Sequence, residues 1–261
     1  MTSHHIKFID LFCGIGSFHY SFRKLGFKCV MASDIYKAAK ENYKENYKMD
    51  ILGDICDIDP SKLKHYDILC AGFPCQAFSN AGHKHAFQDK VRGTLFFDII
   101  RLAKEKQPKF MFLENVKHIK KVDNGNVFKT ILGALDEVGY HIEEETGVFE
   151  LSPHQLGIPQ DRKRVIFVCI RKDIYDQDKI IDLDLDENVE INFDNIIEEN
   201  VDEKYKVSEE IEILFDAWDE IISEMEVGQK LSPTILCNEF HSNYSEEEFK
   251  ELPQWKQDYI T

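Results

Sequence analysis

The chain has 261 residues, a formal net charge of −16 and seven cysteines. No apolar run approaches the roughly 20 residues that span a bilayer, and no signal-type apolar region follows Met1, so we expect a cytoplasmic protein, or a nuclear or viral one if the host is not a bacterium. The cysteines are odd in number and show neither C-x-x-C pairs nor zinc-type spacing, which predicts reduced thiols and no metal site.

The negative charge is confined to the last third of the chain. Residues 1–170 contain 24 Lys+Arg and 21 Asp+Glu (net +3), whereas residues 171–261 contain 8 and 27 (net −19), which together give −16. Charges separated by more than about 10 Å are screened in physiological salt, so this acidity does not exclude a nucleic-acid partner. The shift in composition predicts a first domain over residues 1–171 and an acidic, partly helical segment over 172–261.

Short apolar runs alternate with amphipathic segments through the first domain. The runs predict strands over residues 6–12, 29–33, 51–55, 66–71, 110–114 and 165–170. The segments between them predict helices over residues 17–25, 36–47, 94–105 and 127–138. This alternation is typical of an α/β fold with a mostly parallel sheet and helices on both faces.

A strong helix is predicted after residue 208, with Ser208 as its N-cap. Its apolar side chains recur at steps of three and four, at Ile211, Leu214, Phe215, Trp218, Ile221, Ile222 and Met225. Most such stripes pack on their own domain. That interpretation is favoured here over a partner-binding face.

The first predicted strand ends in a glycine turn that contains Gly14 and Gly16. Asp34 follows 20 residues after Gly14, where a carboxylate can accept the hydroxyls of a ribose, and Asp54 is placed to accept an adenine amino group. Both aspartates could instead cap the segments that follow them. The third glycine of a dinucleotide fingerprint is replaced by His19, which favours a nucleoside cofactor without a pyrophosphate.

A second turn, Gly72-Phe73-Pro74-Cys75, follows the predicted strand 66–71. A thiol there is a candidate nucleophile, although most free cysteines are simply buried. Glu114 ends the next predicted strand in apolar surroundings, where desolvation would raise its pKa and let it share or donate a proton. Arg162 and Arg164 are candidates for supplying positive charge.

These motifs together resemble the cytosine-5 DNA methyltransferases of restriction-modification type. The resemblance runs in the family's order through residues 10–18, 34, 53–55, 72–79, 92–96, 114–116 and 160–164. It implies a Rossmann-like S-adenosylmethionine-dependent methyltransferase fold. It also implies that Cys75 adds to C6 of a cytosine flipped out of double-stranded DNA, that C5 then takes the methyl group, and that Glu114 binds the base while Arg162 and Arg164 orient it.

The resemblance assigns further residues by position. The cofactor pocket would comprise Phe12, Cys13, Gly14, Gly16, Asp34, Ile35, Asp54, Ile55, Pro74 and Leu95. The DNA-binding residues would be Gln76, Ser79, Arg92 and Gln160, and residues 80–92 have the composition of a loop that closes over the base.

Two blocks of the family are not found in these 261 residues, one rich in arginine and one containing Gly-Asn-Ser-Val. Three explanations stay open: a split enzyme with a complementing subunit, a truncated chain, or a remnant with a non-catalytic binding or regulatory role. An RNA cytosine-5 methyltransferase is a further alternative, disfavoured because a Cys-Phe-Thr signature is missing.

Overall fold

The computed structural model describes residues 5–74, 95–179, 181, 183, 185, 189, 192–223, 245, 249 and 250. The chain divides into two compact units, Met1–Asn195 and Ile196–Thr261. The first unit continues beyond residue 171, where the first domain was predicted to end. Just past that residue, the Lys172 N–H donates to the Gly139 carbonyl at 2.9 Å. No helix in the described ranges has the length and apolar character needed to cross a membrane.

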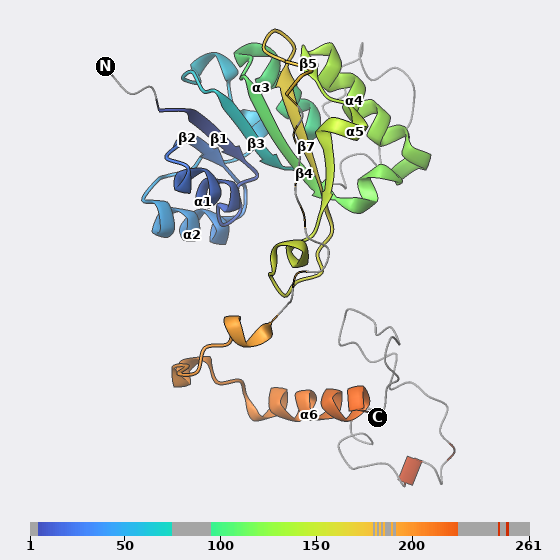
Figure 1. Ribbon diagram of the computed structural model, residues 1–261. Coiled ribbons are helices and arrows are strands. Elements are labelled where there is room, and N and C mark those ends of the chain that lie inside the picture. Colours follow the sequence, from blue (N-terminus) through green and yellow to red (C-terminus); the bar gives the residue numbers. More distant parts are fainter. Residues whose placement is uncertain are drawn as a thin grey trace. The chain divides into compact units, whose positions relative to one another are not determined.

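One seven-stranded sheet forms the centre of the first unit, counted over the described residues (Figure 1). Its strands are β1 (Lys7–Leu11), β2 (Lys28–Ser33), β3 (Ile68–Gly72), β4 (Phe110–Val116), β5 (Tyr140–His141), β6 (Val148–Leu151) and β7 (Arg164–Arg171). Their order is β2-β1-β3-β4-β7-β5, with β6 also paired to β7. Five of the six predicted strands are confirmed, whereas the short strands β5 and β6 were not predicted.

Helices cover both faces of the sheet, as predicted. They are α1 (Ser17–Lys24), α2 (Lys37–Tyr47), α3 (Leu95–Lys106), α4 (Asn126–Glu137) and the short α5 (Glu144–Gly147). Side chains alternate along each strand, so Ile9 packs in the cluster that contains α3 and α4, whereas Phe8 packs in the cluster that contains α1 and α2. Two apolar layers therefore enclose the strands.

The predicted strand over residues 51–55 is wrong. Leu52 makes a single parallel bridge to Ser33, and the chain then forms a 3₁₀ turn over Ile55–Asp57. The carboxylate of Asp54 accepts the N–H of Cys56 at 2.9 Å. A side chain that bonds its own backbone in this way competes with sheet pairing, which explains why an apolar run did not become a strand.

Strand β7 is paired on both sides, as its apolar sequence predicts, but it runs antiparallel to β4. The first four strands pair only in parallel with one another. Because β7 is reversed, its first residue, Arg164, pairs with Val116 at the end of β4. This reversal brings Arg164 to the edge of the sheet where the parallel strands end.

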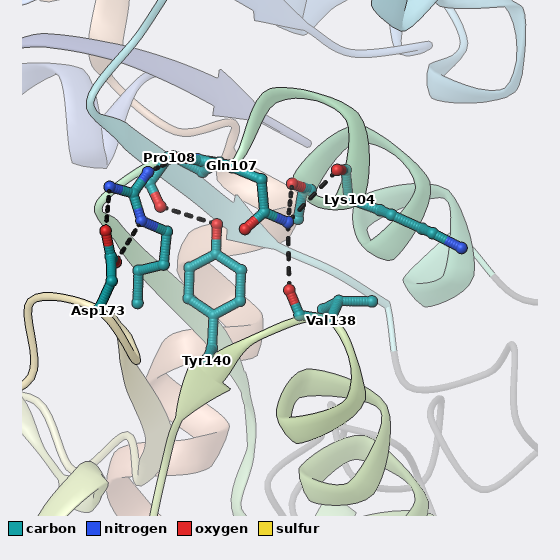
Figure 2. A network of polar contacts seen from close by, with 8 residues as sticks. Lys104, Gln107, Pro108, Val138, Tyr140 and Asp173 are labelled. Atoms are coloured by element: carbon teal, nitrogen blue, oxygen red, sulfur yellow. Dashed lines mark hydrogen bonds and ion pairs between the residues drawn. The ribbon is translucent and has the colours of Figure 1, made fainter.

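A polar network stabilises the other end of the sheet, where β4 begins and β7 ends (Figure 2). Tyr140 donates its hydroxyl to the Pro108 carbonyl at 2.7 Å, and Gln107 donates to the Val138 carbonyl at 3.1 Å. Arg171, the last residue of β7, binds both carboxylate oxygens of Asp173 and the carbonyl of Gln107. This network joins the start of β4 to the ends of α3, α4 and β7.

In the second unit, α6 spans Glu209–Ser223, which confirms the predicted helix. The Ser208 carbonyl accepts the N–H groups of Ile211 and Glu212 at its start. Trp218 is buried, whereas Phe215 and Ile222 of the same stripe are about half exposed. Met225 lies outside the described residues.

Candidate active site

The glycine turn after β1 is tied to the end of β2 through Asp34. The Gly14 N–H donates to Asp34 Oδ2 and the Tyr36 N–H donates to Asp34 Oδ1, both at 2.8 Å. Ile35, between them, is 73% exposed. The predicted cofactor residues of these two turns therefore lie together at the carboxyl ends of adjacent parallel strands.

Gly16 occupies a position where a side chain would clash with Tyr47. Its φ is +89°, and an added Cβ would lie 2.3 Å from Cε2 of Tyr47. The Tyr47 hydroxyl donates to the Gly16 carbonyl at 2.8 Å. Gly14 has φ +52° with open space where its Cβ would be. Phe12 also has a positive φ of 53°, a strained conformation that is common at functional sites.

Asp10, His19 and Tyr43 form a buried polar cluster between β1 and the helices α1 and α2. Asp10 is fully buried, and the Tyr43 hydroxyl lies 3.5 Å from its Oδ2 and 2.7 Å from Nδ1 of His19. Burial raises the pKa of Asp10 to about 8, partly offset by the His19 backbone N–H and the Tyr43 hydroxyl. Burial lowers the pKa of His19 to about 4. Both side chains are therefore neutral at pH 7.

In the third predicted cofactor turn, Asp54 makes the capping bond that was the alternative to ligand binding. Asp54 caps the turn through Cys56, and the side chain of Ile55 is 3% exposed. Arg101 of α3 donates to the carbonyls of Ile55 and Ile58 at 2.9 and 2.6 Å. Sequence reasoning missed Arg101, because nothing in its helix indicates contacts more than 40 residues away.

Cys13 is buried, Leu95 begins α3 half-buried, and Pro74 is exposed. Burial raises the pKa of the Cys13 thiol. Cys75, Gln76, Ser79 and Arg92 lie outside the described residues, as does the predicted loop 80–92.

Glu114 lies beside the start of the Cys75 turn. It pairs in register with Gly72, and a Cβ on Gly72 would lie 3.2 Å from Glu114 Oε2. Glu114 Oε1 is 2.6 Å from Nε of Arg164, with side chains 29% and 20% exposed. Burial raises the pKa of Glu114, and the guanidinium groups of Arg164 and Arg162 oppose that rise. The structure thus brings Glu114 and Arg164 together.

Asn115 faces away from Glu114, because successive strand residues point to opposite faces. Its Nδ2 donates to the Phe73 carbonyl at 2.9 Å, and its side chain is 2% exposed. The Glu-Asn-Val motif was recognised, but the role of Asn115 was not predicted. No signal in the sequence indicates this contact, because it depends on how β3 and β4 are arranged.

The loop between β6 and β7 carries Gln160 and Arg162, both exposed. Ser152 is 4% exposed, and its hydroxyl accepts the Arg162 N–H at 3.0 Å. Gln155 Oε1 accepts the Ser152 N–H at 2.7 Å, completing a capping box. Ser152 was also not predicted, and it holds the backbone of the arginine motif.

Among the described residues, no group of three or more His, Cys, Asp or Glu side chains is arranged to hold a metal ion.

Comparisons with known proteins show the family of this chain. A model of the C-5 cytosine-specific DNA methylase family matches residues 6–257. Type II methyltransferase M.HhaI of Haemophilus parahaemolyticus is 41% identical over 169 residues, covering 65% of this chain and 50% of that protein. Type II methyltransferase M1.ScrFI of Lactococcus lactis subsp. cremoris is 43% identical over 208 residues, covering 78% and 52%.

The fold is also found in solved structures. A mutant DNMT2 of Spodoptera frugiperda superposes with a TM-score of 0.62 at 28% identity, covering 82% of this chain and 65% of that one. The chain spans about half the length of the curated relatives it matches. S-adenosylmethionine is the methyl donor of this family, and the α/β fold is that of its methyltransferases. The chain belongs to the C-5 cytosine-specific DNA methylase family.

Proposed function

We propose that this chain carries the catalytic residues of a DNA (cytosine-5-)-methyltransferase, which moves a methyl group from S-adenosylmethionine to C5 of cytosine. The main support is the partly buried pair of Glu114 and Arg164 beside Gly72, where the Cys75 turn begins. A carboxyl group with a raised pKa next to a fixed guanidinium suits recognition of a base that gains and loses a proton.

The two turns after β1 and β2 fit the cofactor. Open space beside Gly14 lets a ligand approach the backbone, and Asp34 keeps further lone pairs for ribose hydroxyls. The exposed Ile35 offers apolar surface to a purine ring. When bound, S-adenosylmethionine supplies the electrophilic methyl group. Phe12, Cys13, Gly16, Asp54, Ile55, Pro74 and Leu95 complete the proposed pocket.

The chemistry follows from the residues of the chain. The Cys75 thiolate adds to C6 of cytosine, and Glu114 stabilises the charge that develops at N3 and the amino group. C5 becomes nucleophilic and would take the methyl group from the sulfonium of S-adenosylmethionine, so that the S–CH₃ bond breaks and the neutral thioether S-adenosylhomocysteine leaves. A base then removes the C5 proton, the C6–sulfur bond breaks and the thiolate is restored.

The cytosine must leave the duplex to reach Cys75, at a cost of a few kcal/mol. Arg162 and Arg164 orient the base and its phosphate, and Gln76, Ser79, Arg92 and Gln160 bind the DNA backbone. The net charge of +3 in residues 1–170 is compatible with that contact, since Lys and Arg provide most phosphate binding.

A trapping experiment tests this function. The substrate is long duplex DNA that contains 5-fluorocytosine. Fluorine at C5 cannot be removed as a proton can, so a covalent adduct between the base and the chain accumulates when S-adenosylmethionine is present. We expect an adduct that is absent in Cys75→Ser. The chain is assayed alone and with a polypeptide carrying the Arg-rich and Gly-Asn-Ser-Val blocks, because the split-enzyme hypothesis predicts an adduct only with the second chain.

The same assay separates the alternatives. An adduct with 5-fluorocytosine RNA but not DNA would identify an RNA methyltransferase. Binding of DNA without any adduct, with the second chain present, would indicate a non-catalytic subunit and overturn the proposed activity.

A further inference from the structure

We propose that Arg101 is a positioning residue, which fixes the third cofactor turn, residues 54–58, through the backbone carbonyls of Ile55 and Ile58. Its Nη2 lies 2.9 Å from the Ile55 oxygen and its Nη1 lies 2.6 Å from the Ile58 oxygen, across 46 and 43 positions of the sequence. This role rests on the proposed cofactor pocket, because the turn carries Asp54, the proposed acceptor of the adenine amino group.

The guanidinium of Arg101 is itself held by Asp98, three residues earlier on α3. Nε and Nη2 of Arg101 lie 3.0 and 2.9 Å from Asp98 Oδ1, and the two side chains are 35% and 24% exposed. The guanidinium is planar and its N–H donors have a fixed geometry. Fixing one edge of the group against Asp98 therefore also fixes the donors that bind the two carbonyls of the turn.

Asp98 makes a second contact with the same turn. Its Oδ2 accepts the Cys56 thiol at 3.3 Å, so Asp98 and Arg101 together bind three groups of the turn. Ile55 and Ile58 are 3% and 6% exposed, and a buried carbonyl that loses its donor is costly. The turn is therefore fixed to α3 by polar contacts that solvent does not replace.

The internal hydrogen bonds of the turn are short-range and centre on Asp54. Its carboxylate accepts the Cys56 N–H at 2.9 Å, and its carbonyl accepts the Asp57 N–H at 3.2 Å. The Ile55 carbonyl accepts the Ile58 N–H at 3.1 Å as well as binding Arg101. Loss of Arg101 thus loosens the backbone that sets the position of the Asp54 side chain.

The turn lies next to other proposed cofactor residues. Just before it, the Leu52 carbonyl accepts the Asp34 N–H at 3.2 Å, and the Leu52 N–H donates to the Ala32 carbonyl at 2.8 Å. Leu95, a further residue of the proposed pocket, begins α3. In this proposal α3 serves the pocket directly through Leu95 and indirectly through Arg101.

The test compares Arg101→Gln and Arg101→Lys with Arg171→Gln in the full chain. Arg171 is a matched control, because it also binds one carboxylate, that of Asp173, and one backbone carbonyl, that of Gln107, at the other end of the sheet (Figure 2). The readouts are the Tm and the Kd values for S-adenosylhomocysteine and S-inosylhomocysteine. The second ligand carries an oxygen in place of the adenine amino group, so it has no amino group to donate to Asp54.

We expect Arg101→Gln to weaken binding of S-adenosylhomocysteine about tenfold or more, because the turn loses two hydrogen bonds from a charged donor. Binding of S-inosylhomocysteine, which does not use Asp54 in this way, should change much less. The preference for the adenine ligand should therefore fall in Arg101→Gln and fall less in Arg101→Lys, which keeps the charge.

Arg171→Gln should lower the Tm and leave that preference unchanged. If Arg101→Gln fails to fold, Asp98→Asn decides, since it keeps the volume and weakens the hold on the guanidinium. A wild-type preference for the adenine ligand in the variant that decides would overturn the proposal.

Hydrogen exchange of the unliganded protein is a readout that needs neither cofactor nor DNA. The N–H groups of Cys56, Asp57 and Ile58 are bonded within the turn, and peptide mass spectrometry measures their exchange. We expect several-fold faster exchange there in Arg101→Gln and no change there in Arg171→Gln. Equal exchange in Arg101→Gln and the wild type would also overturn the role of Arg101.

The same measurements separate this inference from the proposed activity. A wild type that binds S-adenosylhomocysteine but forms no adduct with 5-fluorocytosine DNA would refute methyl transfer alone, and the comparison of Kd values would still decide the role of Arg101. A wild type that binds neither nucleoside would refute the cofactor pocket, and this inference with it.

Discussion

Glu114 Oε1 and Arg164 Nε lie 2.6 Å apart, on antiparallel strands whose ends meet at the edge of the sheet. Burial raises the pKa of Glu114 while the guanidinium lowers it. The net effect is a pKa raised above the usual value for a glutamate, which makes the carboxyl group a better proton donor to a bound base.

Arg164→Gln should raise the pKa of Glu114 further, because burial then acts without the main opposing charge. If the protonated carboxyl assists attack by Cys75, the alkaline decline in adduct formation moves to higher pH, and the maximal rate falls roughly 100-fold because base orientation is lost. Rate–pH profiles on 5-fluorocytosine DNA measure both effects.

Two variants serve as controls for that result. Arg164→Lys keeps the charge and should leave the alkaline limb in place while lowering the rate. Arg171→Gln removes the arginine at the other end of β7, where it binds Asp173, and should leave the profile unchanged. An alkaline limb that moves to lower pH in Arg164→Gln would contradict the role of Arg164.

The positions of five strands and of the longer helices along the chain could be predicted, because short apolar runs alternate with amphipathic segments. The direction of β7 could not be predicted. Its apolar pattern indicates that the strand is buried but does not say whether it runs parallel or antiparallel to its neighbours. The strand predicted over residues 51–55 does not form for a local reason: the Cys56 N–H donates to the Asp54 side chain.

The surroundings of Glu114 could be predicted from its place at the end of an apolar strand: it is partly buried beside Arg164, and burial raises its pKa. Its role in catalysis stays a prediction. Residues that act through distant backbone were missed. Arg101, Asn115 and Ser152 bind carbonyl or N–H groups 10 to 46 positions away. Those partners are set by how the strands are arranged, which one sequence does not display.

Gly16→Ala should destabilise the glycine turn, because its Cβ would overlap Tyr47 at 2.3 Å and its φ is +89°. We expect a loss of about 1–3 kcal/mol in the free energy of unfolding and weaker binding of S-adenosylmethionine. Urea titration and calorimetry measure the two quantities.

Gly26→Ala is the matched control, since its φ is +78° and its Cβ would meet nothing within 4 Å. It should lose about 1 kcal/mol and keep full cofactor affinity. Equal cofactor affinity in Gly16→Ala and the wild type would show that the turn does not bind the cofactor.

Asp10→Asn should make stability less dependent on pH. Asp10 has a folded-state pKa of about 8 against a usual value of 3.8, so between these values the folded protein keeps a proton that the unfolded chain releases. Its contribution to stability is therefore lost as pH rises through about 8. The variant, which cannot ionise, should show a flatter Tm between pH 6.5 and 9.

The comparison is confined to that range because His19 acts in the opposite direction at lower pH. Its folded pKa of about 4 lies below the usual 6.5, so its contribution to stability is lost as pH falls through that interval. Identical slopes of Tm against pH in Asp10→Asn and the wild type would mean that Asp10 is ionised in the folded protein.

Ser152→Ala should release the loop that carries Arg162. The Ser152 hydroxyl accepts the Arg162 N–H at 3.0 Å and is nearly fully buried, so its removal leaves that N–H unpaired at a cost of about 1–3 kcal/mol. We expect slower adduct formation with unchanged cofactor affinity, because Gly14 and Asp34 lie in the turns after β1 and β2. Thr130→Val removes an exposed hydroxyl on α4, bonded at 2.8 Å to the Asn126 carbonyl, and should change neither rate nor affinity. A Ser152→Ala rate equal to that of Thr130→Val would show that Arg162 does not depend on this anchor.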